Sequence, residues 1–194
     1  MHWRFPADWL DPHAGGTATD LDLAVLLVNS YDALADPPDR LLDLHWLGGV
    51  LRRVGHGQVA DALRDDDLSA LAELRAGLQA AFEATDVAGA AAVVNPLLAT
   101  AGATLALVSD RTSTSGARLE AGTGVSGLQA LQARLPWAVA RRIADRGVAS
   151  VGSCHADPCR CVFVDRTRGG TRRYCCRWCN DRSAARAYRR RQTR

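Results

Sequence analysis

Apolar side chains recur at three- and four-residue steps through much of the first 100 residues, a pattern typical of helices that bury one face. The clearest case runs from Asp20 to Ala35. Its apolar stripe consists of Leu21, Ala24, Val25 and Val28. Thr19 or Asp20 offers a side-chain oxygen to the free backbone N–H groups at the start. We therefore predict a helix over residues 20–35.

The same spacing predicts three further helices, over residues 41–54, 68–85 and 87–101. Asp36-Pro37-Pro38 separates the first two predicted helices, and Gly55 ends the second. Pro96 lies inside the last of them, where a proline kinks a helix or divides it into two shorter pieces.

Alternating apolar and polar positions replace the helical pattern after Gly102. Residues 103–109 read as one strand, residues 110–114 as a turn and residues 116–121 as a returning strand, so we predict a hairpin. Residues 122–135 and 137–146 then supply one or two closing helices, divided by Pro136. The predicted fold is mainly α: a helical N-terminal domain over residues 1–150 with one small β-hairpin, followed by a small module over residues 151–194.

Charge divides the chain at the same place. Residues 151–194 contain 12 of the 24 basic residues and three acids, a net charge of +9, whereas residues 1–150 carry a net charge of −6. Every basic residue is arginine. Such an asymmetry often accompanies a segment that binds nucleic acid.

Several function classes receive no support from the sequence. The first residues lead into polar sequence and not into the apolar core of a signal peptide, and no apolar run approaches the roughly 20 residues that span a bilayer. We therefore expect a cytoplasmic protein without a membrane partner. The five histidines are scattered, and no serine or cysteine has an obvious base and orienting acid nearby in sequence, so we do not expect an enzyme.

All six cysteines lie within residues 154–179. In a reducing cytosol, closely spaced cysteines indicate metal ligands more readily than disulfides, and four thiolates give Zn²⁺ a closed tetrahedral shell. Cys154 and Cys159 form one candidate ligand pair, and Cys175 and Cys179 the other. Cys161 is an alternative ligand in the first pair and Cys176 in the second. Cys176 with Cys179 has the commoner zinc-knuckle spacing, and His155 could replace a thiolate. The pattern predicts one structural zinc ion and leaves the choice among these ligands open.

The last stretch of the chain predicts a basic helix. Residues 182–191 have helical spacing, with Asn180 or Asp181 available as the N-terminal cap. Four arginines share one face, and we predict that they contact nucleic acid: Arg182, Arg186, Arg189 and Arg190. Ala184, Ala187 and Tyr188 lie on another face, which we expect to pack on the zinc core. Arg172 and Arg173, in the loop between the ligand pairs, are expected to grip the phosphate backbone alongside.

These residues resemble a known family. The segments Cys154-His-Ala-Asp-Pro-Cys159, Phe163-Val-Asp165, Arg172-Arg173-Tyr174-Cys175 and Cys179-Asn-Asp-Arg182 are similar to the CGNR zinc finger. Residues 21–30 and 94–95 are similar to the ABATE domain that usually precedes this finger. The resemblance implies that Cys154, Cys159, Cys175 and Cys179 are the zinc ligands, and that the protein is a stress-induced transcriptional regulator whose finger binds DNA.

The chain departs from the family pattern at the signature itself. Cys179-Asn-Asp-Arg182 keeps only the first and last residues of Cys-Gly-Asn-Arg in place, and the interval from Cys175 to Cys179 is one residue shorter than usual. Cys161 stands where the family usually has an aromatic residue. The short interval keeps Cys176 as an alternative third ligand.

Three functional hypotheses follow. The first is a zinc-dependent DNA-binding transcription regulator, in which residues 1–150 sense a small-molecule effector or mediate assembly. The second is an adaptor whose zinc module docks on an acidic protein partner. The third is an RNA-binding protein that uses aromatic side chains of the finger as stacking platforms.

Overall fold

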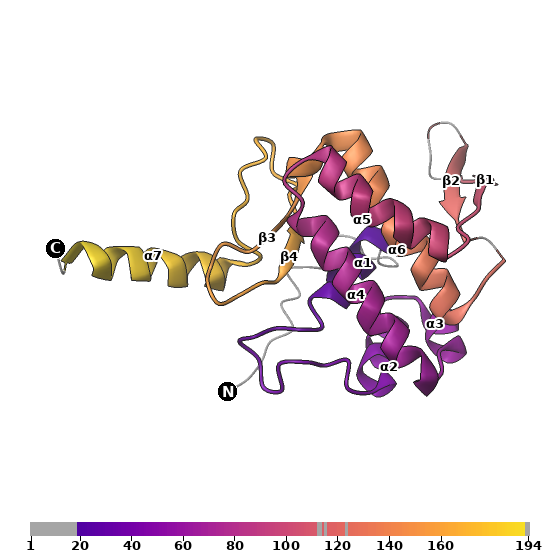
Figure 1. The fold of residues 1–194 in the computed structure, drawn as a ribbon, viewed down its shortest axis with the longest axis horizontal. Coiled ribbons are helices and arrows are strands. Elements are labelled where there is room, and N and C mark those ends of the chain that lie inside the picture. The colour runs from indigo at the N-terminus through magenta and orange to yellow at the C-terminus, as the bar shows by residue number, and fades with distance from the viewer. Residues whose placement is uncertain (1–18, 112–113, 115, 123, 193–194) are drawn as a thin grey trace.

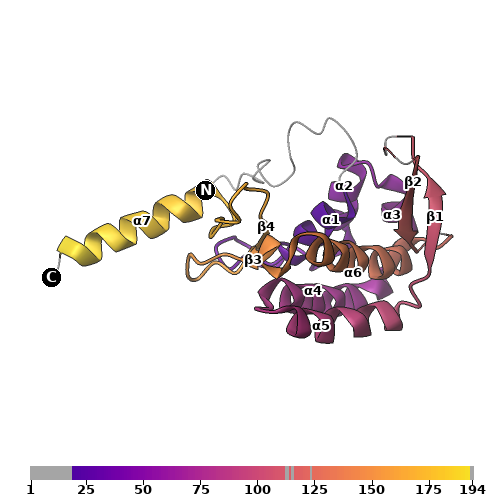
Figure 2. The same cartoon turned by 90° about the horizontal axis from the view of Figure 1, so that it is seen from above.

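The computed structural model describes residues 19–192 apart from 112–113, 115 and 123. In this part of the chain the fold is mainly α, as predicted, with two small hairpins and a C-terminal helix beside the cysteines. Six helices make the body: α1 (Asp20–Val28), α2 (Leu44–Arg53), α3 (Gly57–Ala62), α4 (Leu68–Glu83), α5 (Val87–Thr100) and α6 (Gly127–Arg146). Helix α6 is central and contacts α1, α3, α4 and α5. Seen from above, α4 and α5 lie side by side as a layer along one face of α6 (Figure 2).

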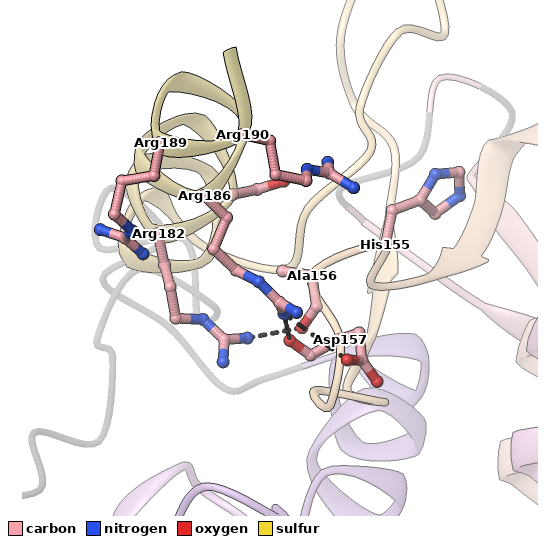
Figure 3. A pocket seen from close by; sticks show the side chains of 8 residues that line it. His155, Ala156, Asp157, Arg182, Arg186, Arg189 and Arg190 are labelled. Atoms are coloured by element: carbon pink, nitrogen blue, oxygen red, sulfur yellow. Dashed lines mark hydrogen bonds and ion pairs between the residues drawn. The ribbon is translucent and has the colours of Figure 1, made fainter. Parts of the chain in front are cut away.

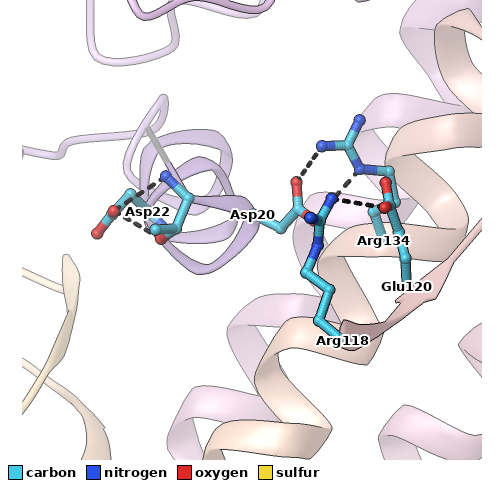
Figure 4. Close-up of polar contacts among 6 residues, drawn as sticks. Asp20, Asp22, Arg118, Glu120 and Arg134 are labelled. Carbon is cyan, nitrogen blue, oxygen red and sulfur yellow. Dashed lines mark hydrogen bonds and ion pairs between the residues drawn. The ribbon is translucent and has the colours of Figure 1, made fainter. Parts of the chain in front are cut away.

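The start of α1 was predicted from its local sequence. The Thr19 side chain accepts from the backbone N–H of Asp22, and the Asp22 carboxylate accepts from the backbone N–H of Thr19, which forms a capping box. One residue into the helix, the carboxylate of Asp20 forms a two-pronged ion pair with the guanidinium of Arg134, at 2.6 and 3.2 Å (Figure 4). This pair fixes the first turn of α1 against the middle of α6.

The predicted C-terminal end of this helix is wrong by seven residues. Helix α1 ends at Val28, and residues 30–40 fold back on themselves, with the N–H of Arg40 donating to the carbonyl of Ser30 at 2.9 Å. The side chain of Asp39 in this loop accepts from Arg75 of α4 at 2.6 and 2.8 Å. The loop is therefore built onto the body, and a longer helix would lose these contacts.

Two prolines at which the sequence left a helix break open do not divide their helices. Pro96 lies inside a continuous α5, and Pro136 lies fully buried inside a continuous α6. Each proline removes one backbone hydrogen bond, and packing of the helices against their neighbours outweighs that loss. The short helix α3 was missed because six residues are too few to show a helical period.

The predicted hairpin is present. Strands β1 (Leu105–Ser109) and β2 (Ala117–Ala121) pair antiparallel, with Leu107 opposite Leu119. A second hairpin, formed by β3 (Val151–Ser153) and β4 (Val162–Val164), was not predicted. Three residues are too few for alternation to be visible in a sequence.

The second hairpin joins the body to the C-terminal segment. Val151, Val162 and Val164 belong to the same hydrophobic core as the helices, whereas Phe163 faces the cysteines. Successive side chains of a strand point to opposite faces, so one short hairpin serves both cores. Beyond it, α7 (Arg177–Gln192) runs away from the body (Figure 1).

No helix among the described residues is long and apolar enough to cross a bilayer. Residues 1–18, where the sequence indicates no signal peptide, lie outside the described part of the chain.

Candidate metal centre and basic helix

The four cysteines that the family resemblance favoured as ligands come together around one point. Cys154 follows β3, Cys159 lies in the connection to β4, Cys175 precedes α7 and Cys179 lies in its first turn. Their sulfur atoms lie within 4.8 Å of one another, and each residue is buried. The Cys159–Cys175 and Cys175–Cys179 sulfur distances are both 3.7 Å.

These distances fit a tetrahedral zinc site. Zn–S bonds of about 2.3 Å place neighbouring sulfurs about 3.8 Å apart at a tetrahedral centre. None of the six cysteines forms a disulfide. The four thiols therefore fit one structural zinc ion with a closed shell, which stabilises the fold and leaves no open position for chemistry.

Proton affinities in the thiol cluster are uneven. Neighbouring thiols, with Cys154 first, lower the pKa of Cys159 because they donate hydrogen bonds to its thiolate. The pKa of Cys154 falls to about 7, since the opposing effect of Cys159 is outweighed by Cys175 and Cys179. The pKa values of the other two ligands, Cys175 and Cys179, are raised, first by hydrogen bonding with Cys154. Metal binding requires thiolates, so zinc must displace protons that the four thiols hold unequally.

The two spare cysteines have different surroundings. Cys161 is buried, and its sulfur lies within 4.8 Å of the Cys159 sulfur and of a carboxylate oxygen of Asp32. Its pKa is raised, first by the hydrogen bond with Cys159 and also by burial, so it remains a neutral thiol beside the ligand set. Cys176 is half-buried at the edge of the cluster and lies outside the four-sulfur group, which contains Cys175 in the contested third position.

Asp165 organises the loop between β4 and Cys175. The residue is 4% exposed, and one of its carboxylate oxygens accepts from the N–H and hydroxyl of Thr167, at 2.7 and 2.6 Å. The other oxygen accepts from the backbone N–H of Arg172 at 2.7 Å. The pKa of Asp165 is lowered because these hydrogen bonds to the carboxylate outweigh the opposing effect of burial, the largest single influence. Sequence reasoning missed this residue as a structural centre, although it had noted the Phe-x-Asp segment.

The guanidinium of Arg172, which was predicted to contact the phosphate backbone, is engaged with the protein's own backbone. Its guanidinium donates to the backbone carbonyls of Tyr174, Val164 and Cys175 and lies 5.1 Å from the centroid of the Phe163 ring. A guanidinium held in this way fixes the polypeptide around the metal site and has fewer N–H groups left for phosphates. Its neighbour Arg173 is exposed, as the predicted role requires.

The basic helix begins earlier than predicted. Helix α7 starts at Arg177, so Asn180 and Asp181 lie within the helix and do not cap it. The shortened interval between Cys175 and Cys179 explains the shift, since Cys179 must point at the metal from within the first turn. The expected apolar contact with the zinc core is also wrong: Ala184 is exposed and Tyr188 is 62% exposed.

Polar contacts orient α7 instead. Arg182 donates to the carbonyl of Ala156 and Arg186 to the carbonyl of Asp157, and Arg186 also pairs with the Asp157 carboxylate at 3.5 Å. On another side, the hydroxyl of Tyr174 bonds the hydroxyl of Ser183 at 2.9 Å. The two arginines fix the second and third turns of the helix to the loop between Cys154 and Cys159, and Tyr174 fixes the second turn to the segment before Cys175.

The four predicted arginines do line one cleft. Figure 3 shows Arg182 and Arg186 reaching from α7 to the loop at residues 155–157, with Arg189 and Arg190 further along the helix. The cleft has a volume of about 470 Å³ and contains one acid against four arginines. It is lined by His155, Ala156, Asp157, Arg182, Ser183, Arg186, Arg189 and Arg190. Its positive charge suits an anionic ligand.

Other arginines of the segment bind the acidic body. Arg166 pairs with Asp22 of α1 at 2.6 Å, and Arg160 pairs with Glu83 of α4 at 2.9 Å. The arginines of the basic segment therefore have two locations: these two loop arginines pair with acids of the body, while α7 carries six others outward (Figure 1).

Comparison with known proteins bears on this part of the chain. No curated protein matches the sequence. Residues 150–192 match the family model described as the CGNR zinc finger. The matched range covers the β3–β4 hairpin, all six cysteines and α7. Together, the match and the site of four buried thiols identify the C-terminal segment as a zinc finger of the CGNR type.

Proposed function

We propose that the protein is a zinc-dependent DNA-binding transcription regulator, in which α7 supplies the DNA contact. The observation that carries this proposal is the cleft of four arginines on a helix that projects from the metal centre. A projecting helix of about 24 Å, at 1.5 Å per residue, is long enough to lie along a major groove.

In this proposal, some arginines orient α7 and others contact DNA. Arg182 and Arg186 are held by backbone carbonyls and orient the helix. Arg189, Arg190 and the exposed Arg173 supply contacts to phosphates. Zinc is required because Cys179 ties the first turn of α7 to the loop that those carbonyls belong to.

The body is proposed to be an ABATE-like domain with a sensing or assembly role. The resemblance at residues 21–30 supports this assignment, and that segment contains α1. Helix α1 contacts β4, so a change in the body has a direct path to the finger.

Titration of a labelled DNA duplex by the full-length protein at several salt concentrations tests the proposal. Three phosphate contacts predict a slope of log K against log salt of about −2.7. Replacing both Arg189 and Arg190 with alanine should reduce the magnitude of the slope by about two. Arg53→Ala, which removes an exposed arginine from α2, is the control and should leave the slope unchanged.

The metal dependence is tested separately. Cys179→Ser, or treatment with a chelator, should abolish retention of the duplex. Undiminished DNA binding by the metal-free protein would refute the proposal. If the protein instead binds an acidic protein surface and shows no affinity for DNA beyond that due to net charge, the adaptor function is favoured. Stronger binding of single-stranded RNA than of either single-stranded or duplex DNA would favour the RNA-binding function.

A further inference from the structure

An exposed tryptophan lies in the first turn of the basic helix α7. Trp178 lies between the ligand Cys179 and Arg177, and it is 59% exposed. The buried thiols occupy the neighbouring side of the helix, so the indole takes no place in the zinc core. The exposed indole is open to contact with a ligand, and aromatic faces are the platforms on which unpaired bases stack.

One side of the indole is already held in place. The guanidinium of Arg182 lies 5.0 Å from the centroid of the Trp178 ring. The same guanidinium donates to the carbonyl of Ala156, which in turn lines the arginine cleft. The ring is therefore positioned by a cation–π contact whose cation is fixed independently.

Trp178 shares a stripe of α7 with the cleft arginines. Positions 178, 182, 186 and 189 follow one another at steps of four, four and three residues, which places them along one side of a helix. Tyr188, the other exposed aromatic of α7, lies off this stripe. An aromatic ring and a row of guanidiniums along one helix face match the two parts of a nucleotide, its base and its phosphate.

We propose that Trp178 is a stacking platform for an unpaired base, and that the finger binds single-stranded nucleic acid through this platform and the adjoining arginines. In a duplex the faces of each base are covered by neighbouring base pairs, so the platform remains unused. The inference rests on the proposed function, because it assumes that Arg189 and Arg190 contact phosphates. The stacking platform adds a preference for single strands over duplexes, which the charge of α7 alone does not provide.

The test compares single strands with a duplex. Full-length, zinc-loaded protein is titrated against oligo(dT) and oligo(rU) of about 12 nucleotides, within the usual range of single-strand site sizes, and against a DNA duplex of matched length. Trp178→Ala should weaken single-strand binding about tenfold, a typical loss for one stacked base. It should change duplex binding less than twofold, and Trp178→Phe should restore most of the lost affinity. The two oligonucleotides show whether the strand is DNA or RNA.

Tyr188→Ala is the matched control, since it removes an aromatic side chain of similar exposure from the same helix. It should leave both affinities within twofold of wild type. Zinc content and far-UV circular dichroism of each variant confirm that the finger is folded. As a second measurement, quenching of tryptophan fluorescence by oligo(dT) should decrease in Trp178→Phe.

The outcomes separate the two proposals. If Trp178→Ala binds single strands as tightly as Tyr188→Ala does, the stacking site is refuted while duplex binding through the arginines still stands. If the wild-type protein binds neither strands nor duplex, the nucleic-acid function fails and the stacking site with it.

Discussion

Replacing Asn29 with alanine tests how the body holds the zinc finger. Asn29 directly follows α1 and is 2% exposed. Its side-chain amide donates to the carbonyl of Val162 at 3.0 Å and accepts from the backbone N–H of Val162 at 2.7 Å. The amide thus completes the outer edge of β4 as a neighbouring strand would.

The expected loss follows from these two contacts. Alanine would leave a buried N–H and a buried C=O of Val162 without partners, and each such group costs about 1–3 kcal/mol. The free energy of unfolding should therefore fall by about 2–5 kcal/mol, a large share of the 5–15 kcal/mol typical of a domain. The backbone N–H of Asn29, which donates to Val25 at the end of α1, is unaffected by the substitution.

Urea denaturation of zinc-saturated protein, followed by far-UV circular dichroism, measures the loss. Zinc transfer to a chromophoric chelator should also become faster, because β4 closes the loop that carries the ligands Cys154 and Cys159. Asn180→Ala is the control, since Asn180 is an exposed asparagine of α7, and it should change stability by less than about 0.5 kcal/mol. An Asn29→Ala protein as stable as the Asn180→Ala protein would refute the proposed edge contact.

Three further predictions concern stability. Asp39→Asn should lower the free energy of unfolding by about 2 kcal/mol at pH 7. Because Arg75 holds the pKa of Asp39 below its usual range, the stability advantage of the wild type is complete above the unfolded-state pKa of about 3.9 and is lost as pH falls through the lower folded-state pKa. Urea titrations across acidic pH would detect this loss. Gly152→Val should destabilise by about 1–3 kcal/mol, because a Cβ at this position lies only 3.3 Å from the Phe163 ring, and thermal denaturation would measure it. Tyr174→Phe should cost about 1 kcal/mol through loss of the hydrogen bond to Ser183 and should increase hydrogen exchange in α7; unchanged exchange would contradict the role of that bond.

Features set by neighbouring residues were predictable from the sequence. The N-terminal cap at Thr19 depends on a short spacing that the sequence displays directly. The four ligand positions were favoured by the resemblance to the CGNR zinc finger, after cysteine spacing alone had left alternatives open. The arginine face of α7 follows from helical spacing once a helix is assumed. In each case the partners lie within a few residues or belong to a recognisable pattern.

Features set by distant partners were not predictable. Helix α1 ends where Asn29 meets Val162, a residue 133 positions away. In the sequence, Arg172 resembles a phosphate-binding arginine because it lies in a basic stretch. In the folded loop, however, its guanidinium donates to three backbone carbonyls that come together only there. Pro136 remains within α6 because burial in the core outweighs the hydrogen bond that it removes.

The hairpin β3–β4 determines how zinc and the helical body influence each other. Its valines complete the core of the body, while Phe163, between two of them, packs with the cysteines. A finger attached only by a linker would lose its metal without consequence for the body. Here the strands that connect the ligand loop are also core strands of the body, and Asn29 pairs with one of them. We therefore expect zinc binding to stabilise helices that do not contact the metal. Removal of zinc should lower the free energy of unfolding of the body as well as of the finger, because both depend on the same two strands.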